Sequence, residues 1–192
     1  MKKISIVLFM LSLILNISGQ SLKGDLSSLR NQSDLYITIH FSNLTIDGEK
    51  EKAWIKDQLE DKTPEEQNEW LTNWNSVWPD SIYVQEFIEK LNDEIKTLSF
   101  KASKNNTAPY TLKITITDID PGVFAGPFST EARISGNIKI YQSESDLAIA
   151  TMEFKHFKGN KYFLTPMMGD RIGNAFATLG EHVGEKLYRV LK

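Results

Sequence analysis

The sequence predicts an α+β fold: a two-layer sandwich in which an antiparallel-dominated sheet of four or more strands carries helices packed on one face. Two patterns predict it. Several segments alternate apolar with polar residues, which is typical of half-buried strands, and two others repeat apolar residues at three- and four-residue steps, which is typical of helices. Because the alternation leaves one face of each strand polar, the sheet is expected to be covered on one side only, unlike a doubly wound parallel sheet.

Four segments have the strand pattern. It begins at Leu35 and ends at Phe41, returns over residues 110–117 and 132–140, and continues over 147–157, which we expect to complete an antiparallel meander. The polar residues between the apolar ones are expected to form the open face of the sheet: Tyr36, Thr38, His40, Thr115, Thr117, Arg133 and Lys139.

Two helices are expected to cover the other face, one at 81–98 after the N-cap residue Asp80 and one at 170–191. The second helix carries a lane of glycines beside its apolar stripe, at Gly173, Gly180 and Gly184. Each interior glycine costs about 1 kcal/mol relative to alanine, so the lane needs an explanation. Either this helix approaches the sheet or the other helix closely, or the lane contacts another protein.

Residues 47–80 are predicted to form a helical insertion that is acidic outside and aromatic inside. Thr63-Pro64-Glu65-Glu66 is typical of a capping box with proline at the first helical position, which predicts a short helix over 64–75. All four tryptophans lie within residues 54–78, and four-residue spacing places three of them on one face: Trp70, Trp74 and Trp78. These rings either pack inside the insertion or bind a sugar or a partner protein.

A second candidate contact point is the loop that begins at Asp120. An apolar stretch that contains Val123, Phe124 and Phe128 begins after Pro121-Gly122 and is interrupted by Gly126-Pro127, two pairs of residues typical of turns. The loop either presents these side chains to a partner or folds them back onto the edge of the core.

The first nineteen residues are predicted to be a secretory signal peptide. Two lysines precede an apolar run over residues 4–15 that is shorter than the roughly 20 residues of a membrane-spanning helix, so cleavage is expected near Gly19. The mature protein is therefore expected in the periplasm or outside the cell, with no transmembrane segment. Residues 20–34 are polar without a sustained period and are predicted to be a flexible arm before a single domain at 35–192.

Charge and motif content argue against several functions. Without residues 1–19, which hold two lysines and no acid, the formal charge falls from -3 to -5, so nucleic acid is not an expected partner. The chain has no cysteine, its three histidines lack the spacing of a zinc site, and Asp118 and Asp120 do not continue into a calcium loop. No nucleophile elbow or phosphate loop is present, so we expect no catalytic residues, no metal and no cofactor.

The order of strand, acidic crossover, helix, meander and glycine-bearing C-terminal helix resembles small α/β domains of the bacterial envelope, such as the amino-terminal domain of TolB and the periplasmic domain of the curli secretion channel. The closing run over residues 169–187, GDRIGNAFATLGEHVGEKL, is also similar to the end of an uncharacterised family of envelope lipoproteins. Many members of that family carry a lipid-anchoring cysteine, which this chain lacks, and residues 47–80 have no counterpart. The resemblance implies a non-catalytic module of envelope assembly and transfers no functional residue.

Together these observations predict a non-catalytic binding or scaffolding module of the cell envelope, with another envelope protein or a second copy of the chain as partner. One alternative is a glycan- or peptidoglycan-binding module that uses the tryptophans. A second is a hydrolase whose acids converge only in the folded chain.

Overall fold

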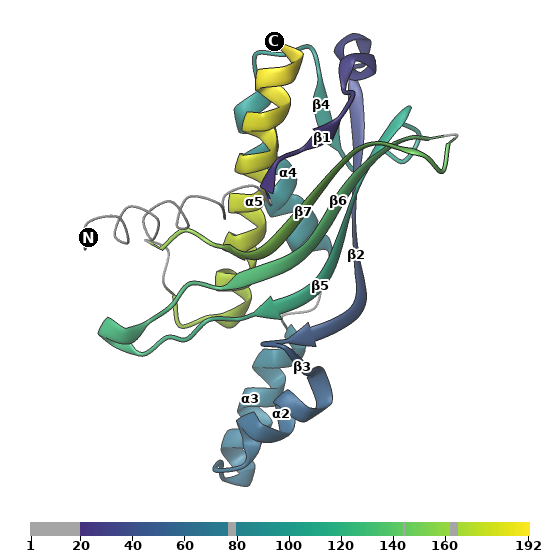
Figure 1. The fold of residues 1–192 in the computed structure, drawn as a ribbon. Helices are drawn as coiled ribbons and strands as arrows, with labels where there is room; N and C mark the ends of the chain where they lie inside the picture. The colour runs from purple at the N-terminus through teal and green to yellow at the C-terminus, as the bar shows by residue number, and fades with distance from the viewer. Residues whose placement is uncertain (1–19, 77–79, 144, 162–164) are drawn as a thin grey trace, which may run out of the picture.

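Seven strands form one sheet in the computed structural model, which describes residues 20–192 except 77–79, 144 and 162–164 (Figure 1). The strand order is β1-β7-β6-β5-β2-β3, and β4 pairs with β2 beside this path. The strands are β1 (Lys23–Gly24), β2 (Asp34–Ile46), β3 (Glu49–Lys50), β4 (Lys101–Ser103), β5 (Tyr110–Asp120), β6 (Arg133–Gln142) and β7 (Ala148–Lys158). The prediction of an α+β fold with an antiparallel-dominated sheet is confirmed.

Strands β5, β6 and β7 form the predicted antiparallel meander. Strand β2 instead runs parallel to β5, and also to the short β4. A parallel pair needs a long crossover, and α4 (Asp80–Ile95) lies within it between β2 and β5. The sequence pattern did not reveal this direction, because alternation is the same in both kinds of ladder.

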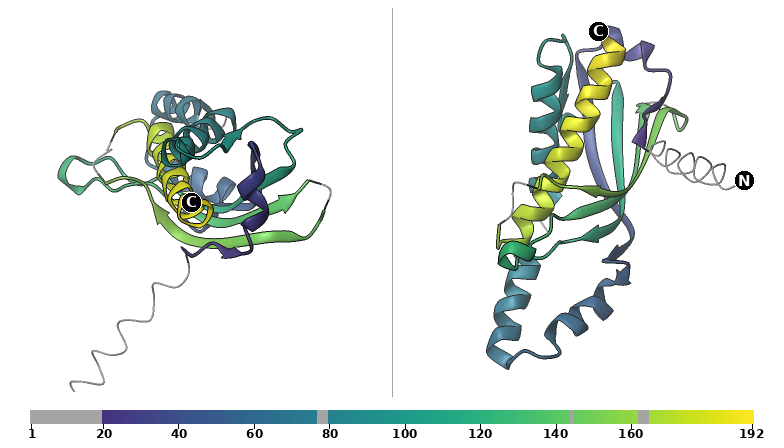
Figure 2. Two further views of the ribbon diagram at one scale, coloured as in Figure 1. Left: turned by 90° about the horizontal axis from the view of Figure 1, so that it is seen from above. Right: turned by 60° about the vertical axis from the view of Figure 1, so that its left-hand side comes forward.

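Helices α4 and α5 (Met168–Leu191) lie together on one face of the sheet, as predicted (Figure 2). The alternating apolar residues of the strands point toward them, and Ile37, Leu112 and Ile138 are at most 1% exposed. On the helices, the Tyr83 and Phe176 rings stack with their centroids 4.9 Å apart. The outward-facing residues of the central strands are half-buried or exposed, so the second face of the sheet is open.

The glycine lane of α5 faces α4 over most of its length. A Cβ atom at Gly180 would lie 2.3 Å from the carbonyl oxygen of Phe87, and one at Gly184 would lie 2.9 Å from that of Leu91. Real side chains do not approach a backbone so closely, so these two glycines allow the helices to touch. The alternative of a contact with another protein is therefore wrong for Gly180 and Gly184, which are buried against α4 in the same chain.

The insertion consists of β3, α2 (Glu51–Leu59) and α3 (Pro64–Ser76), and its two helices extend beyond the end of the sheet (Figure 1). The capping box forms as predicted: Thr63 Oγ1 accepts from Glu66 N, and Thr63 N donates to a Glu66 carboxylate oxygen at 2.8 Å. Because that carboxylate accepts the backbone hydrogen bond of Thr63, the pKa of Glu66 is lowered from its usual value of 4.5.

The segment 20–34 is folded, which corrects the prediction of a flexible arm. Strand β1 pairs with β7, and the 3-10 helix η2 (Ser27–Asn31) follows it. Leu26 and Leu29 are 3% and 0% exposed and belong to the main core. The segment is polar overall because only its few leucines face inward.

Candidate functional site

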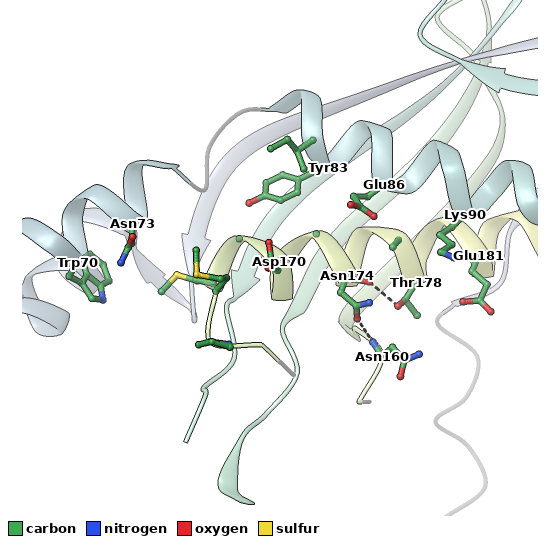
Figure 3. Close-up of a pocket in the computed structure, with 17 residues that line it drawn as sticks. Trp70, Asn73, Tyr83, Glu86, Lys90, Asn160, Asp170, Asn174, Thr178 and Glu181 are labelled. Carbon is green, nitrogen blue, oxygen red and sulfur yellow. Dashed lines mark hydrogen bonds between the residues drawn. The ribbon is translucent and has the colours of Figure 1, made fainter. Parts of the chain in front are cut away.

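A groove of about 810 Å³ lies where α3 and α4 meet the first half of α5 (Figure 3). Its residues come from four separate parts of the chain. They are Trp70 and Asn73 of α3; Ile82, Tyr83, Glu86 and Lys90 of α4; Asn160 and Pro166 to Asp170 before and at the start of α5; and Gly173, Asn174, Ala177, Thr178 and Glu181 of α5. Of the residues predicted as candidate sites, Trp70 and Gly173 belong to this groove.

The groove exists because α4 and α5 diverge toward the beginning of α5. At Gly180 an added Cβ would collide with the backbone of α4, whereas at Gly173 it would lie 3.8 Å from Glu86 Cγ and 3.9 Å from the Tyr83 ring, an ordinary contact distance. Packing between the helices therefore explains Gly180 but does not require a glycine at 173. The small residue at Gly173 instead leaves space at the floor of the groove.

The groove is lined by both apolar and charged side chains. Trp70, Ile82 and Met167 line one part of it, and the side chains of Ile82 and Met167 are 51% and 57% exposed. The charged lining residues are Glu86, Asp170, Glu181 and Lys90, with an acidic excess of two charges. An apolar surface beside fixed negative charge suits a ligand that combines an apolar group with a positive one.

Hydrogen bonds fix the polar wall formed by α5. Asn174 Oδ1 accepts from the backbone N–H of Asn160 at 2.6 Å, and Thr178 Oγ1 donates to the carbonyl oxygen of Asn174 at 2.8 Å (Figure 3). The first bond joins the segment after β7 to α5 and the second lies within α5, so this wall is organised without a ligand.

A buried arginine connects the groove to the loop between β5 and β6. Arg171, on α5, is 5% exposed, and its guanidinium donates to the carbonyl oxygens of Pro121, Gly122, Thr165 and Pro166 at 2.7 to 3.3 Å. Burial disfavours the charged form and lowers the pKa of Arg171, while the neighbouring Asp170 opposes this effect. One side chain thus holds together the base of the loop and the groove wall at Pro166.

The loop itself is braced by its own hydrogen bonds. Thr130 and Val123 exchange two of them, and Ser129 Oγ accepts from Ala125 N at 2.9 Å and donates to Gly126 O, around the 3-10 helix η3 (Gly126–Phe128). Val123, Phe124 and Phe128 are 56%, 48% and 81% exposed. They do not fold back onto the core, so the loop has the presented arrangement that the sequence left open.

The tryptophans form a small core of the insertion. Trp54, Trp70 and Trp74 have ring centroids 4.8 to 5.9 Å apart, and Trp74 Nε1 donates to Glu51 at 3.1 Å. Trp74 is 1% exposed and cannot stack on a sugar, whereas Trp70 is half-buried at the groove. Trp78 lies outside the described residues.

Sequence reasoning missed most of the groove. Tyr83, Glu86 and Met167 are ordinary helix and loop residues in the sequence, and only the pairing of α4 with α5 brings them together. Two signals were available: Trp70, which the sequence grouped with the other tryptophans of the insertion, and the glycine at 173, which the sequence could not separate from the packing glycines of the same lane.

Within the described part of the chain, no three histidine, cysteine, aspartate or glutamate side chains gather in a way that could hold a metal ion. A search for membrane spans over the same residues finds no helix with the length and hydropathy required.

Comparison with known proteins gives little further information. No family model and no curated protein matches the chain. A solved dodecamer of PelC from Paraburkholderia phytofirmans is similar at a TM-score of 0.41 and 6% sequence identity, over 84% of this chain and 97% of the PelC chain. A dodecamer of a point variant of this PelC is similar at a TM-score of 0.40 and 7% identity, over 85% of this chain and 95% of the variant chain. Such values support no conclusion about the ligand or assembly of this chain, and they leave the resemblance to TolB and the curli channel a prediction.

Proposed function

We propose that this protein is a non-catalytic binding module of the bacterial cell envelope that holds a segment of another protein in the groove between α3, α4 and α5. The observation that carries the proposal is the widening of the α4–α5 pair at Gly173, which keeps a preformed space open beside exposed Ile82 and Met167. An envelope location rests on the predicted signal peptide.

The lining favours a peptide segment over a sugar. Apolar side chains at the groove suit an aliphatic or aromatic residue of the partner, and the acidic excess suits a lysine or arginine next to it. The glycan alternative depends on exposed tryptophan rings, and Trp74 is buried. The loop that presents Phe128 is tied to the same groove through Arg171, so it offers a second contact to the same partner.

Capture of partners from an envelope extract tests the proposal when groove variants are compared. Gly173→Leu places a side chain in the groove, whereas Gly173→Ala adds one methyl at ordinary contact distance and serves as the matched control. We expect a specific protein to be retained by the original chain and by Gly173→Ala and lost with Gly173→Leu, while circular dichroism shows all three folded.

A photo-crosslinking side chain locates the contact. Placed at Ile82, it should form a covalent adduct with the captured protein, and placed at Leu147, which is 80% exposed in the β6–β7 hairpin, it should not. Equal adducts at both positions, or a partner that Gly173→Leu retains, would show that binding does not use the groove.

A further inference from the structure

The open face of the sheet carries a row of lysines that only the strand register reveals. Each member of this row is paired with the next one across neighbouring strands. In order, the row consists of Thr38 of β2, Lys113 of β5, Lys139 of β6, Thr151 of β7 and Lys23 of β1. Directly paired residues point to the same face, and this face is the one without helices. The row therefore runs across five strands with three positive charges and no acid.

The lysines of this row have no polar partner among the residues that the structure describes. None of Lys23, Lys113 and Lys139 makes an ion pair or a side-chain hydrogen bond in the described residues. Lys113 and Lys139 are direct cross-strand neighbours, where like charges repel and destabilise the sheet. In a chain with excess acid, the fold thus keeps an unfavourable positive pair at the centre of its open face. An anion bound between the two ammonium groups would remove the repulsion.

The row next to the lysines supplies flat surfaces for stacking. Tyr36, Thr111 and Tyr141 are paired across β2, β5 and β6, two residues along from the lysine row, and both tyrosines are half-buried. Tyrosine offers an apolar ring face together with a polar hydroxyl, which suits a sugar ring. On the other side lies the row of His40, Thr115, Asn137 and Glu153, in which Thr115 and Asn137 supply a hydroxyl and an amide for hydrogen bonds and Glu153 adds one negative charge to this face.

The dimensions favour a polymer. Five paired residues span four gaps between strands, and at about 4.8 Å per gap the row is about 19 Å long, longer than one sugar. The row contains threonine rather than large apolar residues, which disfavours insertion into a lipid surface.

We propose that this face binds an anionic polysaccharide, with carboxylates on Lys23, Lys113 and Lys139 and sugar rings against Tyr36 and Tyr141. The site is separate from the groove and does not depend on the proposed function. Charge-assisted bonds from ammonium groups to carboxylates would supply the salt-dependent part of the affinity.

Titration of the protein with polygalacturonate, in which every sugar bears a carboxylate, tests this site. We expect binding that weakens as salt is added, no binding of neutral dextran, and an affinity at least tenfold lower when Lys23, Lys113 and Lys139 are all changed to glutamine. The control variant changes Lys52, Lys56 and Lys62 of the insertion to glutamine, which removes the same charge from another surface, and it should bind as the original chain does.

Three results would overturn the proposal: no binding of polygalacturonate, an equal loss in both triple variants, or binding of phosphatidylglycerol vesicles with none of the polysaccharide. Because the lysines are exposed or half-buried, the first triple variant should stay folded, which circular dichroism verifies. Tyr141→Ser is a second test. If the tyrosine ring stacks on a sugar, this variant should bind polygalacturonate more weakly, while the salt dependence of its affinity stays unchanged.

Discussion

Alanine substitution at two glycines of the same helix should change stability in opposite directions. Replacing an interior helical glycine by alanine favours the helix by about 1 kcal/mol. At Gly173 the new methyl would lie 3.8 Å from Glu86 Cγ, so nothing offsets this gain and Gly173→Ala should be more stable by about 1 kcal/mol. At Gly180 the methyl would lie 2.3 Å from Phe87 O, a backbone atom that moves only if the helices separate.

Overpacking of this kind costs about 1 to 3 kcal/mol, so Gly180→Ala should lose up to about 2 kcal/mol after the helical gain of about 1 kcal/mol is included. The two variants should therefore differ by about 1 to 3 kcal/mol. Urea unfolding followed by circular dichroism measures the difference as a shift of midpoint at constant slope. If Gly180→Ala proved as stable as Gly173→Ala, the α4–α5 contact would not be as close as described, and the argument that Gly173 serves the groove would fail.

Three further predictions concern the supports of the site. Arg171→Lys should lower the stability of the protein by about 2 kcal/mol and speed hydrogen exchange in the β5–β6 loop, because one ammonium group cannot reach the four carbonyls that the guanidinium spans. Unchanged hydrogen exchange would contradict the role of Arg171. Trp74→Ala should lower stability by about 3 to 5 kcal/mol, because it empties the core of the insertion. The near-ultraviolet circular dichroism should be lost while the sheet persists, and a retained near-ultraviolet signal would refute this prediction. Burial, with the nearby Lys186, lowers the pKa of His182 below its usual 6.5, so the contribution of His182 to stability should be full above pH 6.5 and lost as pH falls through the folded-state pKa. His182→Gln should remove this part of the pH dependence of stability, and an unchanged pH profile would exclude a role of His182 in it.

The elements with a strong period were predictable from sequence, and those without one were not. Strand β5 and helix α5 follow their apolar patterns to within two or three residues of the predicted ends, because burial on one face imposes that pattern. The segment 20–34 has no period, since a two-residue strand and a 3-10 turn need only two or three inward leucines to dock. A short pairing of this kind is decided by the edge of β7, which lies far away in the sequence.

Neither proposed surface could be assembled from the sequence, although Trp70, Gly173 and Lys139 were each singled out, and the reason is the same for both. Lys23, Lys113 and Lys139 are ordinary surface residues until the register of four strands aligns them. The groove likewise depends on where α4 and α5 stop touching, and that point is set by packing between residues distant in the chain. Sequence patterns specify which face of an element is buried, but not which exposed residues of different elements become neighbours.

The two surfaces lie on opposite layers of the protein, which determines how their ligands can interact. The groove is on the helical layer and carries an acidic excess, while the lysine row is on the open face of the sheet and is positive. Figure 2 shows the two layers, with α4 and α5 on one face of the sheet. At physiological salt, charges farther apart than about 8 Å are largely screened from one another. A helix layer and a sheet separate the two surfaces, so electrostatic coupling between their ligands should be weak. The protein could then hold a partner protein and an anionic polysaccharide together, and Gly173→Leu should leave the affinity for polygalacturonate unchanged. A change in that affinity would instead require a shift of α5 against the sheet, because in the described part of the chain Lys23, Lys113 and Lys139 make no ion pair or side-chain hydrogen bond to the groove.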